Sequence, residues 1–196
     1  MKARYLIYDV TTPRGVCRLE AVTNVPQWAH MHKSEPQAGR FPADASFRMS
    51  RDFPKDIKLA DSLSNTNDFL VVSEKLKDFL AQEEFLAHNE VHPVAIVNHK
   101  GRKETARYFI IHQIDDPACV DETKTKGAKS KLMPDEYSVM KKLVLDETKI
   151  PPDYAIFRAA QYKSRILFRS DVAEKIQAAG FTGLKFSELK GYDDFY

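Results

Sequence analysis

Hydrophobic and polar positions separate an irregular N-terminal third of the chain from a more regular remainder. The apolar run at residues 5–8, which stops at Asp9, predicts a first strand. Residues 11–66 show little periodicity and contain seven Pro or Gly residues that interrupt possible elements. We therefore expect residues 11–66 to be rich in loops and to lie over a body built by the rest of the chain.

A strand followed by a capped helix is predicted twice in that remainder. In "FLVVSEKLKDFL" (69–80), an apolar strand leads to Ser73 as helix N-cap and to Glu74 in the first turn. In "ILFRSDVAEKIQ" (166–177), Ser170 and Asp171 occupy the same positions. A side-chain oxygen satisfies free amide groups at a helix start, and an acid there complements the helix dipole. Helix capping therefore explains both serines without a catalytic role.

The end of the second copy carries signals for a helix end. Val172, Ile176 and Ala179 are spaced like the buried stripe of a helix. Gly180 stands where a residue with positive φ stops a helix. The segment 181–186 is then expected to turn into another strand.

Strands and turns are predicted between the two copies. Residues 91–114 form two β-rich runs around Gly101, which is typical of a hairpin with a charged tip. Pro93 lies near the start of the first run, so this strand should lie at a sheet edge or start late. The Lys-rich residues 122–131 are predicted to form a mobile polar loop. Three further strands are expected near Leu143, Ile156 and Leu167.

Together these elements predict an α+β fold with a mixed or antiparallel sheet, a few short helices and a loop-rich N-terminal part. A chain of 196 residues can bury a core without disulfides. We expect one structural domain, in which a strand and loop-rich segment at 1–66 packs on an α+β body at 67–196.

Composition favours a soluble protein of the cytoplasm. Hydrophobic residues make up 43% and charged residues 30% of the chain, close to the average for soluble proteins. No apolar run has the length of a membrane span, and the N-terminal run is too short for a signal peptide. The two cysteines, Cys17 and Cys119, have no paired spacing and are expected to be buried and reduced.

The charge balance argues against a general nucleic-acid-binding protein. The formal net charge is only +2, whereas affinity for phosphates is built from many unpaired cations. Residues 67–122 hold 6 basic and 11 acidic side chains, and the flanking parts are mildly basic. This distribution suits electrostatic steering toward a charged partner protein.

No catalytic or metal-binding motif is complete in the sequence. Residues 168–172 lack both Gly residues of a nucleophile elbow, and the loop around 127–130 lacks those of a phosphate-binding motif. His30 and His32 could lie on one face of a strand, but beyond Glu35 no further ligand stands at a recognised metal spacing. We therefore expect no catalytic residue, no metal and no cofactor.

Three blocks of the second half resemble a known protein family. They are "DFLVVSEKLKDFL" (68–80), "YFIIHQIDDPACVDETKT" (108–125) and the segment 143–186, which ends in "GFTGLKF". In this order they are similar to the MXAN-type immunity domain, the eleventh immunity family of bacterial polymorphic toxin systems. The resemblance covers about residues 67–189, and the N-terminal strand is a weaker match.

The resemblance implies a protein that binds and neutralises a cognate toxin encoded by a neighbouring gene, without catalysis. It does not identify the contact residues. From their charge and their position in turns, we predict two contact regions: the hairpin tip with Lys100, Arg102 and Lys103, and the acidic turns with Asp115, Asp116, Asp121 and Glu122.

Two other functions stay open at this stage, as does the oligomeric state. A small cytoplasmic enzyme would need a pocket in which polar groups converge. A weak nucleic-acid-binding protein would use the Lys-rich loop together with Arg102, Lys103 and Arg107, and its binding would depend strongly on salt.

Overall fold

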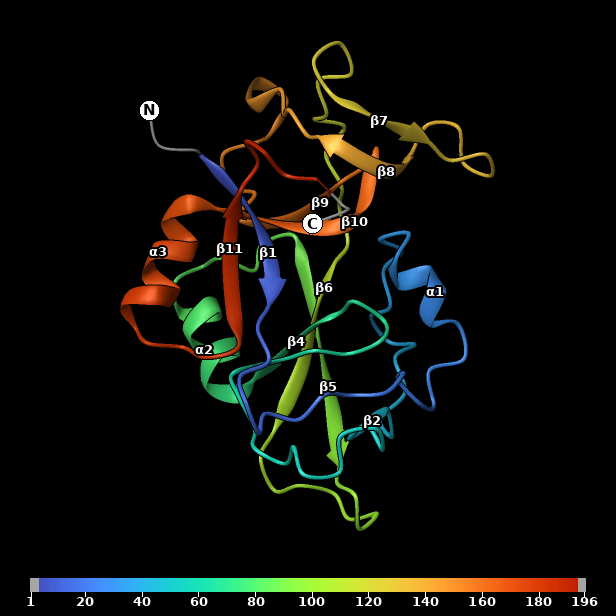
Figure 1. The fold of residues 1–196 in the computed structure, drawn as a ribbon, viewed down its shortest axis with the longest axis vertical. Coiled ribbons are helices and arrows are strands. Elements are labelled where there is room, and N and C mark those ends of the chain that lie inside the picture. Colours follow the sequence, from blue (N-terminus) through green and yellow to red (C-terminus); the bar gives the residue numbers. More distant parts are fainter. Residues whose placement is uncertain (1–3, 194–196) are drawn as a thin grey trace.

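Two β-sheets that share an apolar layer form the centre of the computed structural model, which describes residues 4–193 (Figure 1). The first sheet is antiparallel and contains, in spatial order, β11 (Leu184–Glu188), β1 (Tyr5–Val10), β10 (Tyr162–Arg169) and β9 (Ile156–Ala159). The second is mixed and contains β2 (Ser46–Arg48), β5 (Asn89–Val97), β6 (Tyr108–Gln113), β4 (Leu70–Ser73) and β3 (Ser62–Leu63). The predicted α+β class is confirmed.

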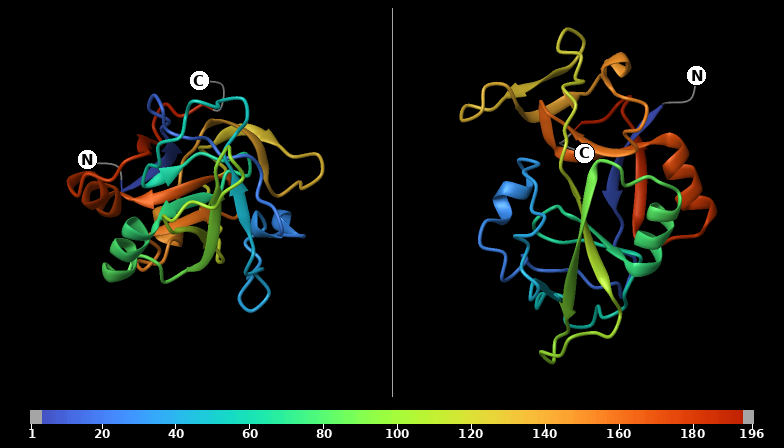
Figure 2. Two further views of the ribbon diagram at one scale, coloured as in Figure 1. Left: turned by 90° about the horizontal axis from the view of Figure 1, so that it is seen from below. Right: turned by 180° about the vertical axis from the view of Figure 1, so that it is seen from behind.

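The remaining elements surround these sheets. The helices are α1 (Trp28–Met31), α2 (Glu74–Gln82), α3 (Ser170–Ala178) and the short 3₁₀ helix η1 (Glu147–Lys149), and a separate hairpin pairs β7 (Lys126–Lys129) with β8 (Tyr137–Lys142). The two longer helices lie on one side of β5 and β6, and α1 lies on the other (Figure 1, Figure 2). Within residues 4–193, no helix has the length and apolar character needed to span a bilayer.

Alternate residues of the central strands face different apolar layers. On β6, Phe109 and Ile111 enter the layer between the sheets, whereas Ile110 faces the N-terminal segment. On β10, Phe168 enters the same middle layer and Leu167 faces an outer layer beneath the β7–β8 hairpin. The period-two pattern of each strand thus places it between two cores.

The N-terminal segment is rich in loops, as predicted, yet it supplies much of one core. Its buried side chains include Leu19, Met31 and Phe47, which pack with Val71 and Ile96 of the five-stranded sheet. Residues 1–3 and 194–196, the ends of the two predicted segments, lie outside the described residues.

The first strand–helix copy forms as predicted. Ser73 is the N-cap of α2, and its Oγ accepts a hydrogen bond from the Leu76 N–H at 3.3 Å. Leu76 and Leu80 are buried beneath the helix. The local capping signal was therefore sufficient at this site.

The second copy differs at its start. Arg169, not Ser170, is the N-cap residue of α3, and no side chain caps the helix. The Ser170 N–H instead donates to the Arg4 carbonyl at 2.8 Å, and Asp171 accepts two hydrogen bonds from the Arg169 guanidinium at 2.7 and 3.0 Å. The predicted cap is wrong because contacts with the neighbouring strand and with Arg169 replace it.

The end of α3 follows the prediction in its turn but not in its buried stripe. Gly180 has φ +72°, and the Phe181 N–H returns to the Ile176 carbonyl at 3.4 Å, as expected for a helix stop. Ala179 is exposed, and Ala173 takes the predicted buried place beside Val172 and Ile176. The helix ends one residue before Ala179, so this residue leaves the buried face.

The hairpin of β5 and β6 is confirmed, with Gly101 at φ +74° in its tip. Strand β5 begins at Asn89, so a late start is wrong. Strand β2 pairs only with Ala95–Val97, which leaves Pro93 paired on one side, with β6. Pro93 is thus placed where its missing N–H is tolerated.

The Lys-rich segment is not simply a loop. Residues 126–129 form β7, and all four are exposed. A Cβ on Gly127 would lie 2.4 Å from the Val139 carbonyl oxygen, so the two strands approach closely there. The expected loop was wrong because the strand is formed by its cross-strand partner and carries no apolar alternation of its own.

Both cysteines are free and buried. Burial raises the pKa of the Cys17 thiol to about 11 and that of Cys119 to about 12. The expectation of buried, reduced thiols is confirmed.

Candidate functional site

The predicted contact residues lie at opposite ends of the five-stranded sheet. Lys100, Arg102 and Lys103 are exposed in the tip of the β5–β6 hairpin, at the lower end of the molecule in Figure 1. The Asn98 Oδ1 accepts hydrogen bonds from the Lys100 and Arg102 N–H groups at 3.0 and 3.1 Å, which fixes the tip. The acidic residues follow the other end of β6. The two predicted regions therefore do not form one continuous patch.

Asp115 belongs to a cluster with a histidine. Its Oδ2 accepts a hydrogen bond from the Tyr154 hydroxyl at 2.5 Å and lies 3.4 Å from His88 Nδ1. The other ring nitrogen of His88 lies 2.9 Å from Asp153 Oδ2, and the His88 ring stacks on Tyr154. Burial and the neighbouring Asp115 raise the pKa of Tyr154 above its usual range. The Asp115 carboxylate is thus shared between two partners of its own chain.

Asp116 has a buried side chain. Its side chain is 5% exposed, and burial raises the pKa of the carboxyl group. Its Oδ2 accepts a hydrogen bond from Ser34 Oγ and lies 3.4 Å from Lys163 Nζ, while Oδ1 is buried without a partner. Asp116 therefore positions these two neighbours and presents little carboxylate to solvent.

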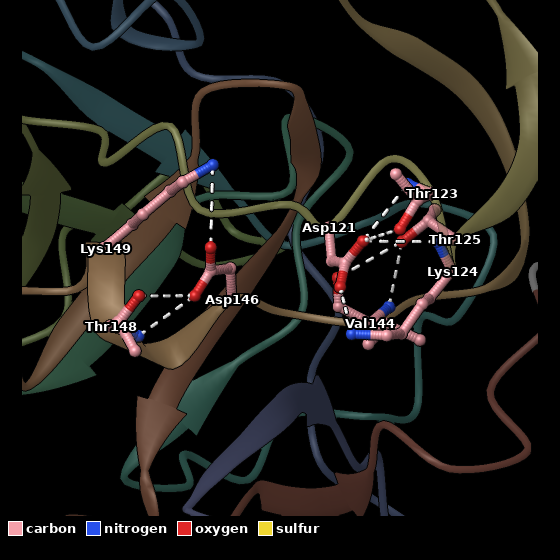
Figure 3. A network of polar contacts seen from close by, with 8 residues as sticks. All are labelled: Asp121, Thr123, Lys124, Thr125, Val144, Asp146, Thr148 and Lys149. Carbon is pink, nitrogen blue, oxygen red and sulfur yellow. Dashed lines mark hydrogen bonds and ion pairs between the residues drawn. The ribbon is translucent and has the colours of Figure 1, made fainter.

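Asp121 and Glu122 belong to the first of two matching turns (Figure 3). The sequence Asp-Glu-Thr-Lys occurs at 121–124 and again at 146–149. The residues before the turns, Val120 and Leu145, pair in an antiparallel bridge. The turns therefore lie side by side.

The two turns use the same hydrogen bonds. Asp121 Oδ1 accepts from the N–H and hydroxyl of Thr123 at 3.1 and 2.7 Å. Asp146 Oδ1 accepts from the N–H and hydroxyl of Thr148 at 3.3 and 2.6 Å. An aspartate that binds the backbone two residues further on mimics a backbone turn and orders it. Each turn is thus held by its own first residue.

A lysine completes each turn. Lys124 Nζ lies 2.7 Å from Asp121 Oδ2, and Lys149 Nζ lies 3.6 Å from Asp146 Oδ2. Hydrogen bonds from Lys124 and then Thr123 lower the pKa of Asp121 to about 2. The hydrogen bond from the Thr148 hydroxyl is the main cause of a lowered pKa at Asp146. Both aspartates stay ionised and engaged at neutral pH. Glu122 and Glu147 are the exposed acids of the turns, and Glu122 Oε1 lies 2.5 Å from Lys129 Nζ.

A cleft of about 510 Å³ lies between the N-terminal segment and the β7–β8 hairpin. In Figure 1, α1 and this hairpin lie on the same side of the molecule. Trp28 and Met133, 39% and 42% exposed, line the cleft from these two elements. Lys33, Lys163 and Arg165 add positive charge to its lining. None of the residues that line this cleft is among the contact residues predicted from the sequence.

Arg158 lies deep in the wall of the cleft and is 3% exposed. Its guanidinium donates from Nε to Gln113 Oε1 at 3.2 Å, from Nη2 to the Asp68 carbonyl at 2.9 Å and from Nη1 to the Lys163 carbonyl. Burial lowers the pKa of Arg158 to about 10, so the group is still charged at neutral pH. It ties β9 and the adjoining β10 to two segments that are distant in sequence, at Asp68 and Gln113.

Among residues 4–193, no group of three or more His, Cys, Asp or Glu side chains is arranged to hold a metal ion. His30 Nδ1 lies 2.6 Å from Glu35 Oε2, and the His32 ring stacks on Phe69.

Comparison with known proteins gives one family. The model of the immunity protein family Imm11 matches residues 11–191, nearly the whole chain. No curated protein matches the chain. The family match includes the loop-rich N-terminal segment, which the sequence resemblance from about residue 67 onward did not.

Proposed function

Because the chain belongs to the Imm11 immunity protein family, we propose that it binds a cognate protein toxin and neutralises it by covering the toxin's active site or substrate cleft. The observation that carries this proposal is the family match over residues 11–191. The toxin is the product of a neighbouring gene, and the two proteins meet in the cytoplasm. Inhibition of this kind requires no catalytic step by the immunity protein.

The surface turns support binding as a preformed body. The tip of the β5–β6 hairpin is held by Asn98, and each of the two matching turns is held by its aspartate. Surfaces that are already ordered lose less conformational entropy on association, which favours tight binding. Charged groups at such positions also speed the encounter with a partner of complementary potential.

The contact residues proposed for the toxin are the exposed members of the predicted set: Lys100, Arg102 and Lys103 in the hairpin tip, Asp115 after β6, and Glu122 in the first matching turn. Asp116 and Asp121, which are less exposed, act through the neighbours that they hold. In this proposal the hairpin tip and the matching turns contact separate parts of the toxin, because they lie at different ends of the molecule.

Co-expression with the product of the neighbouring gene tests the function. We expect growth to be rescued from the toxicity of that product and a stable complex to copurify. In an activity assay of the purified toxin, inhibition should end at one immunity protein per toxin molecule. Complete inhibition at far lower ratios would instead indicate an enzyme. The absence of both rescue and complex would refute the proposal.

A further inference from the structure

We propose that the cleft between Trp28 and Met133 receives an acidic segment of the cognate toxin that carries an apolar side chain. This inference rests on the proposed function, because it names the part of the toxin that the protein recognises. The charge and the rim of the cleft favour this occupant over a neutral or basic one, and its wall is already ordered.

Charge in the cleft favours an acidic occupant. Four cationic side chains line it against two acidic ones, Asp68 and Glu136. The exposed Lys33 ammonium has no ion-pair partner among the described residues. Lys163 is shared with the buried Asp116, which fixes its position beside the cleft. A carboxylate that enters the cleft is attracted by these cations in a partly desolvated environment, where ion pairs are stronger than at an open surface.

The rim of the cleft favours an apolar side chain beside that carboxylate. Trp28 and Met133 are two of five large hydrophobic side chains that are exposed in the described chain, and Leu132, 93% exposed, precedes Met133. The Trp28 ring makes edge contacts with His32 and Phe69, with ring centroids 5.7 and 6.5 Å away. Tryptophan, methionine and arginine are enriched where protein interfaces concentrate their binding energy. A held tryptophan at the mouth of a cleft is therefore suited to anchor a partner.

The wall of the cleft makes the site preformed. The guanidinium of Arg158 is bound to three oxygens of the chain, and the Lys163 main chain is one of them. Lys163 Nζ also lies 3.3 Å from the Lys33 carbonyl oxygen, so it links the two sides of the cleft. Because these contacts exist before binding, an incoming segment does not have to order the wall.

The single tryptophan of the chain gives a direct readout. Trp28 is the only tryptophan, so protein labelled with 5-fluorotryptophan has one ¹⁹F resonance, and it lies at the cleft. We expect addition of the unlabelled toxin to shift this resonance, and a peptide with the toxin's acidic, apolar-anchored segment to reproduce the shift at low salt. A resonance that stays unchanged while the complex forms would overturn the cleft proposal.

Substitutions then test charge and anchor separately. Lys33→Glu and Trp28→Ala should each weaken toxin binding by about tenfold or more. Lys55→Glu and Ile57→Ala are matched controls, because both side chains are exposed and neither lines the cleft; they should change the affinity less than about twofold. Thermal unfolding of each variant shows whether a loss of affinity reflects a loss of folding.

The outcomes separate the two proposals. If the wild-type protein binds and protects but both cleft variants bind as tightly as their controls, the toxin uses another surface and only the cleft proposal fails. If the wild-type protein neither binds nor protects, the proposed function fails and the cleft proposal with it.

Discussion

Histidines give the folded chain a dependence on pH that can be measured residue by residue. Burial is the main cause of a lowered pKa at His32, His92 and His112, and for His32 the pKa falls to about 4. In the unfolded chain a histidine titrates near 6.5. Between these values the unfolded state binds more protons than the folded state, so acid favours unfolding.

We expect the free energy of unfolding to be highest above about pH 6.5. Protonation of these histidines should lower it by on the order of 2–3 kcal/mol by about pH 4.5. Urea unfolding at several pH values measures the loss. His112→Gln should remove part of the pH dependence, whereas the exposed His99→Gln should leave it unchanged. Equal pH dependence in both variants would show that buried His112 is not a source of the effect.

The role of a single residue could be predicted from the sequence only where its hydrogen-bond partner is nearby in the chain. Ser73 could be recognised as a cap because its hydrogen-bond partner, Leu76, is three residues away. Ser170 could not be placed correctly because the carbonyl of Arg4, the residue before β1, binds its N–H. The repeated Asp-Glu-Thr-Lys was visible, but its meaning depends on the bridge between Val120 and Leu145, which no local pattern indicates.

At the scale of elements, the turn into β11 brings the backbones of the two sheets into direct contact. Gly183 has φ +85°, and a Cβ there would lie 2.1 Å from the Ser62 carbonyl oxygen of β3. The Gly183 carbonyl accepts a hydrogen bond from the Thr11 N–H at 3.0 Å, and the Ser62 N–H donates to the Thr182 carbonyl at 3.0 Å. A side chain at this position would force the backbones of both sheets apart.

Gly183→Ala should therefore lower the free energy of unfolding by about 3 kcal/mol or more, since it adds a positive-φ penalty to a clash with backbone. Gly180→Ala is the matched control. It has a similar φ of +72° but open space around its Cβ, and should cost only about 1 kcal/mol. Equal losses in urea unfolding would mean that the close approach to Ser62 does not matter.

Elements were predictable when hydrophobic periodicity and turn residues acted together. Strands β4 and β6, and residues 166–168 of β10, carry continuous apolar runs because both of their faces are buried. Strand β7 has no such pattern, since all its residues are exposed, and only pairing with β8 makes it a strand. The missing N–H of Pro93 correctly predicted a position that is paired on one side only, although β5 as a whole lies between β2 and β6 and not at the edge of the sheet.

At the scale of the whole molecule, the proposed single domain is a prediction that unfolding can test. The layer between the sheets combines β4 and β6 with β9, β10, α2 and α3, and the N-terminal segment packs on the other face of β6. Trp28 reports on that segment, and far-ultraviolet circular dichroism reports mainly on α2 and α3. If the layers unfold as one unit, the two signals should change at the same urea concentration. An earlier change in Trp28 fluorescence would show that the N-terminal segment unfolds separately.

The cleft could not be predicted from the sequence because its lining comes from four regions. Trp28 and Lys33 belong to the loop-rich segment, Asn67 precedes β4, Met133 lies between β7 and β8, and Arg158 lies on β9. None of these residues stands in a motif, and only their arrangement makes a site. The immunity family, by contrast, could be recognised from the order of the strand and helix blocks, because that order is a property of the linear sequence.

The hydrogen bonds of Arg158 also affect which cleft residues can change as the sequence of such a protein evolves. Two of its three acceptors are the main-chain carbonyls of Asp68 and Lys163, whose side chains line the cleft. A carbonyl remains an acceptor whichever side chain its residue carries. Position 68 can therefore exchange charge for charge, or charge for apolar surface, while Arg158 keeps its hydrogen bonds. At position 163 the same exchange also keeps the bond to Arg158 but gives up the contacts of the Lys163 ammonium with Asp116 and the Lys33 carbonyl. Selection for a new partner can thus act on the lining without first rebuilding the scaffold beneath it.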